Sequence, residues 1–279
     1  MLPLNLIYLK YFSDAVRFGS VSASAKHNFV SQSAVSQAIS KLENALKIAL
    51  IEHHPNRLRI THEGQRVFEK SLSLFDEIKS LEASLQTEEG AGQVDFACTH
   101  SFALALLPKK LKEAKKRFPK IQLNFRLGHP GLIMDMLKKG LIDFGIVLDN
   151  EDLSDFESRE IYSGEHKLYI AKSIKNPDNL PFILSEERME TKLLKQAYRE
   201  KKKEELKTGM EVFSWEAIAG LTEEGLGIGF FPDYIAYRRP KLKEHPLKFG
   251  SFPYKLFAIL PKGRVINQNI KSFIDLLTQ

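Results

Sequence analysis

The apolar residues near the start of the chain recur at every third or fourth position, which predicts amphipathic helices. Gly19 ends the first helix, and Ser20 can cap a short second helix over 21–28. Ser31 can cap a third. The apolar positions of the first and third helices are Leu6, Leu9, Phe12, Val16, Val35, Ile39, Leu42 and Leu46. This part of the chain is therefore expected to form a small helical unit.

A short alternating segment and a long helix come next. Leu58 and Ile60 alternate with Arg57 and Arg59, which is the pattern of a half-exposed strand. Thr61 then begins a helix with a single apolar stripe, which consists of Val67, Leu72, Phe75, Ile78, Leu81 and Leu85. Because one long helix with an apolar stripe is not stable alone, we expect it to pair with another chain.

Beyond a linker at 88–92, the pattern changes to alternating strands and helices. Strands are predicted over 94–99, 121–127 and 144–148, with helices over 102–118 and 132–139. This order predicts a parallel sheet covered by helices. Further elements are expected at 167–170, 182–184, 215–224, 228–231, 255–260 and 267–277, and an exposed charged helix at 188–206.

Composition limits the function only loosely. The net charge of +6 is compatible with a polyanionic partner but is common among proteins without one. Cys98 is the single cysteine, so the chain cannot form an internal disulfide. Neither a secretory signal nor an apolar run approaching the roughly 18 residues of a membrane span is present. We therefore expect a cytoplasmic protein with no membrane association.

The third predicted helix has a face of small polar residues, which are Ser31, Gln32, Ser33, Ser36, Gln37 and Ser40. Small hydrogen-bonding side chains let a helix approach base edges in the major groove of DNA. Serine hydroxyls and the helix N-terminus also suit phosphate oxygens. By itself the pattern fits a solvated helix face equally well.

This region resembles the DNA-binding half of LysR-type transcriptional regulators. The matching residues are Phe12, Gly19, Ser20, Ala23, Ala25, the run Val30 to Ser36, Ile39, Leu42, Glu43, Leu46, Leu50, Thr61 and Gly64. The resemblance implies a winged helix-turn-helix at 1–64 and a dimerisation helix at 65–91. It also implies that double-stranded DNA is contacted by Ser31, Gln32, Ser33, Ser36, Gln37, Lys41, Arg57 and Arg59, with the last two on the wing.

The chain departs from the family pattern at several positions. Arginine is common in the family where Gln37 and His53 stand, so the expected DNA face has lost fixed positive charge. Glycine is usual in place of Lys47, leucine in place of Asn28 and phenylalanine in place of Ile51.

The remainder resembles the two-lobed, periplasmic-binding-protein-like effector domain of the same family. The matching segments are Leu107-Pro108, Phe118-Pro119, 140–143, 225–228 and Phe231-Pro232. The expected architecture is therefore α/β and multidomain, with lobe I at 92–160 and 262–279 and lobe II at 161–261.

A ligand cleft is expected at the carboxyl ends of the strands. The candidate effector contacts are Thr99, His100, Ser101, Gly128, His129, Leu148, Ser185, Phe213, Ser214 and Phe230. Thr99 and Ser101 lie at a helix start, which favours a carboxylate, and the two histidines could add charge or hydrogen bonds.

We therefore interpret the chain as a ligand-responsive DNA-binding regulator that forms a homodimer and, by resemblance, a homotetramer. An enzyme is not expected, because no nucleophile elbow, phosphate loop or zinc-protease motif occurs. Gly225 to Gly229 lacks the strand and helix that flank a dinucleotide fingerprint, and His53-His54 has no third metal ligand nearby, so no cofactor or metal is expected. Two alternatives stay open: a regulator with a vestigial pocket controlled by protein contacts, and a stand-alone small-molecule binding protein.

Overall fold

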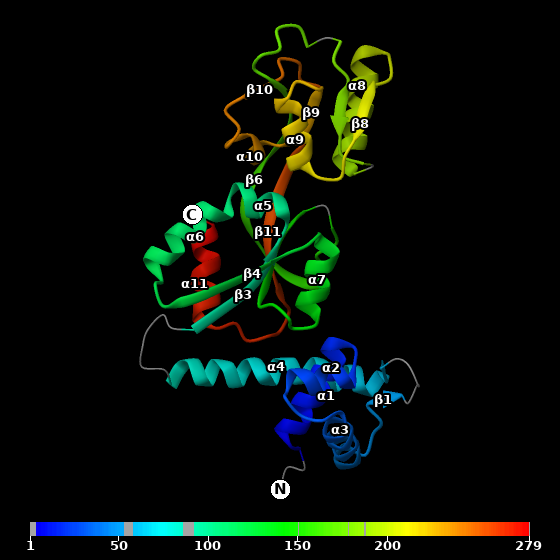
Figure 1. Cartoon of the computed structure of the whole chain (residues 1–279), viewed down its shortest axis with the longest axis vertical. Helices are drawn as coiled ribbons and strands as arrows, with labels where there is room; N and C mark the ends of the chain where they lie inside the picture. Colours follow the sequence, from blue (N-terminus) through cyan, green and yellow to red (C-terminus); the bar gives the residue numbers. More distant parts are fainter. Residues whose placement is uncertain are drawn as a thin grey trace.

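The computed structural model describes residues 4–52, 58–85, 92–149, 151–177, 179–186 and 188–278. Three parts follow one another along its long axis: a small helical unit, lobe I and lobe II (Figure 1). A long helix, α4 (His62–Leu85), lies between the helical unit and lobe I.

The helical unit consists of α1 (Leu6–Phe18), α2 (Val21–His27) and α3 (Gln32–Leu46), followed by the two-residue strands β1 (Ile51–Glu52) and β2 (Arg59–Ile60). Ser20 and Ser31 cap α2 and α3 as predicted, because each hydroxyl accepts a hydrogen bond from a backbone N–H three residues later. The buried core of the unit comprises Leu9, Phe12, Ala15, Ala25, Val35, Ile39, Leu42 and Leu50, together with Phe68 and Leu72 of α4.

Lys47 ends α3 in a left-handed conformation with φ 58°. An L side chain is strained there, which accounts for the glycine that is usual at this position in the family. We expect Lys47→Gly to raise the free energy of unfolding by about 1 kcal/mol. Chemical denaturation of both proteins measures the difference, and a destabilised variant would contradict the prediction.

Lobe I contains a mixed sheet. Its strands are β3 (Gly92–Cys98), β4 (Ile121–Leu127) and β5 (Phe144–Leu148), and β3 pairs in parallel with both of the others. The helices are α5 (His100–Ala105), α6 (Leu107–Arg117), α7 (Pro130–Lys138) and α11 (Gln268–Leu277). The expectation of one helix over 102–118 was wrong: the chain breaks at Leu106, and α6 starts with Pro108 in its first turn, where a residue without an N–H is tolerated.

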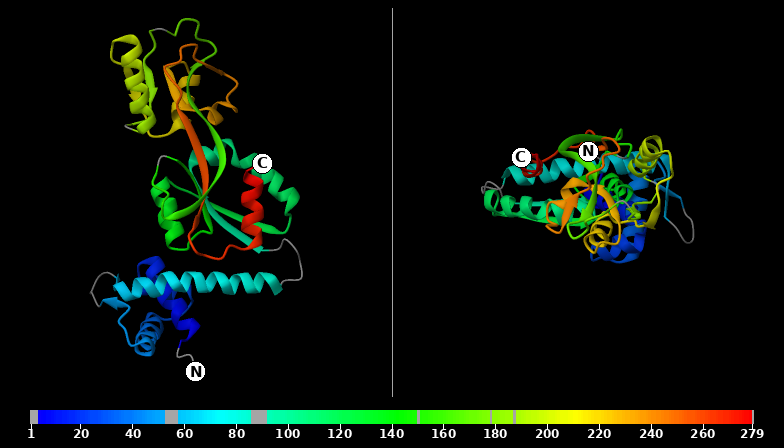
Figure 2. Two further views of the ribbon diagram at one scale, coloured as in Figure 1. Left: turned by 180° about the vertical axis from the view of Figure 1, so that it is seen from behind. Right: turned by 90° about the horizontal axis from the view of Figure 1, so that it is seen from above.

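Two long strands connect the lobes (Figure 2). β6 (Phe156–Ala171) leaves lobe I, and β11 (Pro253–Pro261) returns antiparallel to it. β11 pairs with β5 in lobe I, and β6 pairs with β9 and β10 in lobe II, so the β6–β11 pair joins the two lobes. The sequence pattern anticipated only 167–170 of β6, because the exposed crossing half of this strand has no continuous apolar run.

Lobe II is a second small α/β unit. Its strands are β7 (Phe182–Leu184), β8 (Thr208–Glu211), β9 (Ile228–Pro232) and β10 (Leu242–Glu244), and its helices are α8 (Met189–Lys202), α9 (Trp215–Glu223) and α10 (Asp233–Ala236). The predicted charged helix over 188–206 corresponds to α8. The short strand β8 was not anticipated; it pairs in parallel with β7.

Among the described residues, none of the helices combines the length and the apolar character of a membrane span.

Candidate functional site

The first candidate site is the outer face of α3. Val35, Ala38, Ile39 and Leu42 are buried, which turns the polar positions of the helix outward. The predicted contacts Ser31, Gln32, Ser33, Ser36, Gln37 and Lys41 are all exposed. This face of α3 can therefore enter a groove without displacing any core side chain.

Local hydrogen bonds organise the start of this face. The Ser31 hydroxyl accepts from the Ala34 N–H at 3.1 Å and lies 2.9 Å from the Ser33 hydroxyl. The Ser22 hydroxyl donates to Gln32 Oε1 at 2.8 Å, which fixes the Gln32 amide against α2. Phe29, which sequence reasoning missed, is 96% exposed in the turn directly before α3. Nothing in the hydrophobic pattern distinguishes such a ring from a core residue.

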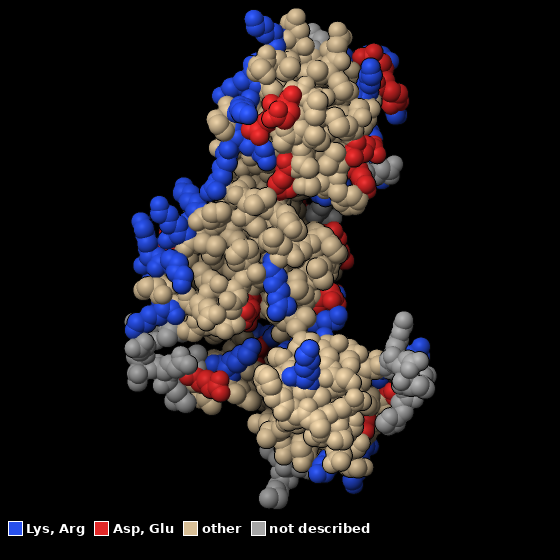
Figure 3. Space-filling model, viewed as in Figure 1, with Lys and Arg blue, Asp and Glu red and all other residues tan. Residues whose placement is uncertain are grey.

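Fixed positive charge is sparse around α3. Lys41 lies over the Tyr8 ring at 5.8 Å, and Arg59 is exposed on β2. Arg57 and His53 fall outside the described residues. Residues 1–90 hold ten Lys or Arg and ten Asp or Glu, so the chain's positive excess lies beyond them. In Figure 3 lysine and arginine side chains gather over α6 of lobe I, while the face of the helical unit in view is mostly uncharged.

The second candidate site is a cleft between the lobes. Eight of the ten predicted effector contacts line one cavity of about 720 Å³: Thr99, His100, Ser101, Gly128, His129, Leu148, Phe213 and Ser214. The lobe I members lie at or directly after the carboxyl ends of β3, β4 and β5, as strand order predicts. The structure places the other two elsewhere. Ser185 is buried and lies 2.8 Å from the Thr191 hydroxyl, and Phe230 is buried against Phe252.

Sequence reasoning missed the cationic residue of the cleft. Arg188 lines the cavity, with its guanidinium stacked 4.5 Å from the Trp215 ring and its Nη2 donating to the Phe213 carbonyl at 3.1 Å. Trp215 is 5% exposed, and its indole N–H has no hydrogen-bond partner among the described residues. No sequence signal marked Arg188, because its role depends on the position of α9 in space.

The polarity of the cavity is mixed. Glu151 and Glu216 also line it, and the Ser214 hydroxyl donates to Glu216 at 2.8 Å. His166 packs 5.5 Å from the Trp215 ring, and burial lowers the pKa of its imidazole to about 4. This histidine is therefore neutral at physiological pH. Leu104 and Phe213 add exposed apolar surface.

Within the described ranges, no group of three or more His, Cys, Asp or Glu residues is placed to bind a metal ion.

Comparison with known proteins gives consistent matches over both parts. The family model described as "Bacterial regulatory helix-turn-helix protein, lysR family" matches residues 6–65, and the model described as "LysR substrate binding domain" matches residues 87–279. The chain is 27% identical over 290 residues to the probable transcriptional regulator LrrA of Synechococcus elongatus, covering 99% of this chain and 97% of LrrA.

A second relative matches over a shorter stretch. The chain is 30% identical over 158 residues to the transcriptional regulator CysB of Burkholderia cenocepacia, so the match spans 55% of this chain and only 50% of CysB. Among solved structures, full-length LysG from Corynebacterium glutamicum with bound effector arginine aligns with a TM-score of 0.69 at 15% identity. That alignment covers 99% of this chain and 97% of LysG, which shows that the two share a fold.

Proposed function

The chain belongs to the LysR family of DNA-binding transcription regulators with an effector-binding domain, and on that premise we propose that it binds DNA as a homodimer under the control of a small carboxylate. The observation that carries the proposal is a cavity of about 720 Å³ with Arg188 on its wall, in the same chain as the exposed polar face of α3. A cytoplasmic location follows from the proposed DNA target.

Arg188 supports a carboxylate as ligand. A guanidinium presents paired N–H donors that match a carboxylate in a bidentate arrangement. Trp215 fixes the plane of this guanidinium, and the Phe213 carbonyl takes one of its donors. On the opposite wall Thr99, Ser101 and His129 offer further hydrogen-bonding groups. The exposed side chains of Leu104 and Phe213 favour a ligand with an apolar body.

The effector proposal can be tested with benzoate and its neutral analogue benzamide. By titration calorimetry we expect benzoate to bind and benzamide not to bind. Arg188→Gln should weaken benzoate binding by about 10- to 100-fold, since a hydrogen-bonded charge is lost. Arg199→Gln is the matched control, because Arg199 on α8 pairs with Glu205 in solvent. Equal binding of both compounds, or no effect of Arg188→Gln, would contradict a carboxylate-binding site at Arg188. Failure of both compounds to bind would favour the alternative of a regulator with a vestigial pocket.

A groove beside α4 supports the dimer. It encloses about 610 Å³ and is lined by Leu4, Leu9, Leu46, Ile48, Val67 and Leu74, with Glu63, Arg66, Glu69 and Lys70 around them. Leu81, further along α4, is 60% exposed. An apolar groove with charges of both signs at its margin suits the α4 helix of a second copy. Pairing of effector domains into a tetramer is proposed from the family resemblance alone.

We expect Leu74→Glu to convert the dimer to a monomer of 31.8 kDa, because a carboxylate would then be buried in the apolar groove. Light scattering after size-exclusion chromatography measures the mass. Leu193→Glu is the matched control. Leu193 is 47% exposed and Leu74 is 36% exposed, but Leu193 lies on α8 of lobe II, away from the groove. If Leu74→Glu keeps twice the chain mass, two copies do not pair through this groove.

A further inference from the structure

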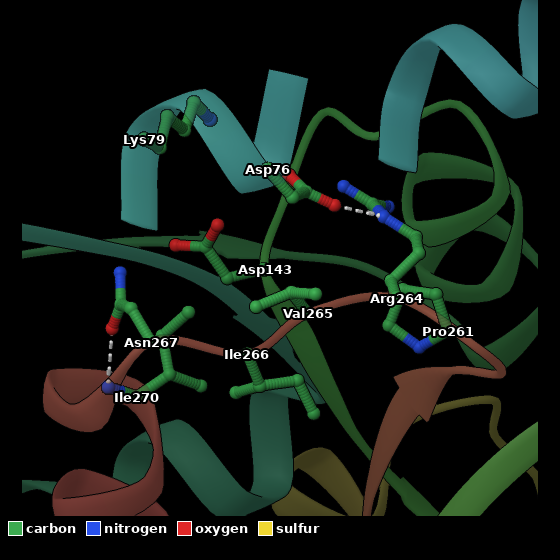
Figure 4. Close-up of a pocket in the computed structure, with 9 residues that line it drawn as sticks. All are labelled: Asp76, Lys79, Asp143, Pro261, Arg264, Val265, Ile266, Asn267 and Ile270. Atoms are coloured by element: carbon green, nitrogen blue, oxygen red, sulfur yellow. Dashed lines mark hydrogen bonds and ion pairs between the residues drawn. The ribbon is translucent and has the colours of Figure 1, made fainter. Parts of the chain in front are cut away.

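Two ion pairs lie where the helical unit, α4 and lobe I come together. Arg264, in the segment after β11, pairs with Asp76 of α4 (Figure 4). Arg17 of α1 pairs with Asp14 one turn earlier, with Arg17 Nη1 3.6 Å from Asp14 Oδ1. Arg17 Nη2 and the Leu72 side chain both lie beside Gly140, and Leu72 is one helical turn from Asp76 on α4, so the two pairs are neighbours. We call these four residues the junction cluster.

The junction cluster is largely shielded from water. The side chains of Asp14, Asp76 and Arg264 are 4%, 11% and 12% exposed, and that of Arg17 is 22% exposed. Isolated charges with so little hydration are costly, so each holds its partner in place. Exposed ion pairs, in contrast, constrain geometry little. The junction cluster is therefore suited to fix an orientation.

The junction cluster reaches lobe I at a second point. Arg17 Nε donates to the Lys139 carbonyl at 3.1 Å, in the turn after α7. Beside it, Leu72 of α4 packs against Gly140, where an added Cβ would lie 2.9 Å from Leu72 Cδ2. Gly140 has φ 64°, a left-handed backbone conformation that favours glycine. Lobe I thus contacts α1 and α4 at two separate places.

On its other side the junction cluster extends toward α3, the proposed recognition helix. Asn28 Nδ2 donates to Asp14 Oδ2 at 2.9 Å, and Lys10 Nζ lies 3.0 Å from the same oxygen. Asn28 ends α2 and begins the turn that leads into α3. It stands where the family usually has leucine, so this chain replaces an apolar contact by a polar one that joins the cluster.

We propose that Asp14, Arg17, Asp76 and Arg264 are positioning residues that hold the DNA-binding unit and lobe I of one chain in a fixed relative orientation. Lobe II is joined to lobe I through β6 and β11. Ligand-driven motion then occurs between the lobes, and α3 turns together with lobe I. A ligand that changes the orientation of lobe I in the assembly would thereby change the separation of the two recognition helices.

The orientation can be measured by electron–electron distances between spin labels at Ser40→Cys on α3 and Lys112→Cys on α6, both exposed positions. Cys98 is buried and the pKa of its thiol is raised to about 12, so it stays unlabelled. Labelled protein is mixed with an excess of unlabelled protein, so that only distances within one chain are observed. Neither DNA nor effector is needed, and the result is therefore independent of the proposed effector and dimer.

We expect a single narrow distance distribution for the otherwise native chain and one at least about twofold broader for Arg264→Gln. The exchange of Asp76→Arg with Arg264→Asp should restore the narrow distribution, which a general loss of stability would not do. Arg159→Gln is the control, because it removes an exposed ion pair with Asp275 inside lobe I. A narrow distribution in Arg264→Gln, a failure of the exchange to restore it, or equal broadening in Arg159→Gln would overturn the proposal.

Discussion

Ser36→Glu is expected to weaken binding to the intergenic DNA beside the protein's own gene by at least about 100-fold, because each chain would bring a carboxylate against the phosphates and base edges of the groove. Ser36 is exposed in the middle of the polar face of α3, with buried Val35 and Ala38 on the opposite side. Folding should therefore be unaffected. Fluorescence anisotropy with labelled DNA measures the change in affinity.

The matched control is Ser173→Glu, which adds the same charge at an exposed turn in lobe II. It should bind DNA within about twofold of the native protein, since charges beyond a Debye length are screened. Equal losses in both variants would show only a general effect of net charge. Unchanged binding by Ser36→Glu would show that α3 does not enter the groove.

Gly64→Ala is expected to cost the helical unit about 3 kcal/mol of unfolding free energy and with it DNA binding. A Cβ at Gly64 would lie 2.1 Å from the Leu50 carbonyl oxygen and 2.8 Å from Ile60 Cγ1. That carbonyl accepts a hydrogen bond from the Thr61 N–H at 3.1 Å, next to the paired strands β1 and β2 of the wing. The carbonyl therefore cannot move without breaking this hydrogen bond. Glycine at 64 is therefore required by close backbone approach rather than by an unusual φ.

Gly220→Ala provides the comparison. Gly220 lies within α9, and an added Cβ there would meet nothing within 4 Å. Because alanine favours a helix over glycine, this variant should gain up to about 1 kcal/mol. Thermal and chemical denaturation of both variants measures the two effects. Similar stability of the two variants would show that the wing does not pack against Gly64 as described.

The sequence was sufficient wherever local rules decide the structure. Ser20 and Ser31 were predicted to cap helices, and Thr61 was predicted to begin one. Each of the three hydroxyls accepts a hydrogen bond from a backbone N–H at a helix start. Thr99, Gly128 and Leu148 line the cleft because the order of parallel strands brings their carboxyl ends to one edge. Both results depend on spacing along the chain.

Features that depend on contacts between distant segments could not be predicted. Arg188 belongs to the cleft because α9 carries Trp215 beneath it. Arg264 meets Asp76 across 188 positions of the chain, and no periodicity records that contact. Ser185 follows the end of β7 and Phe230 lies within β9, and both side chains are buried in lobe II rather than in the cleft. The direction of such side chains depends on how helices and strands pack together. The pattern of hydrophobic and polar residues does not give the relative positions of those elements.

Recognition of a DNA sequence through α3 and the wing can be measured by titrating the native protein at several salt concentrations. The probes are the intergenic DNA beside its own gene and a scrambled duplex of the same composition. With Lys41, Arg57 and Arg59 from each of two chains, we expect log K to fall with log salt with a slope of about −5. The intergenic DNA should bind at least about 1,000-fold more tightly than the scrambled duplex. Equal affinity for the two duplexes would contradict sequence-specific recognition.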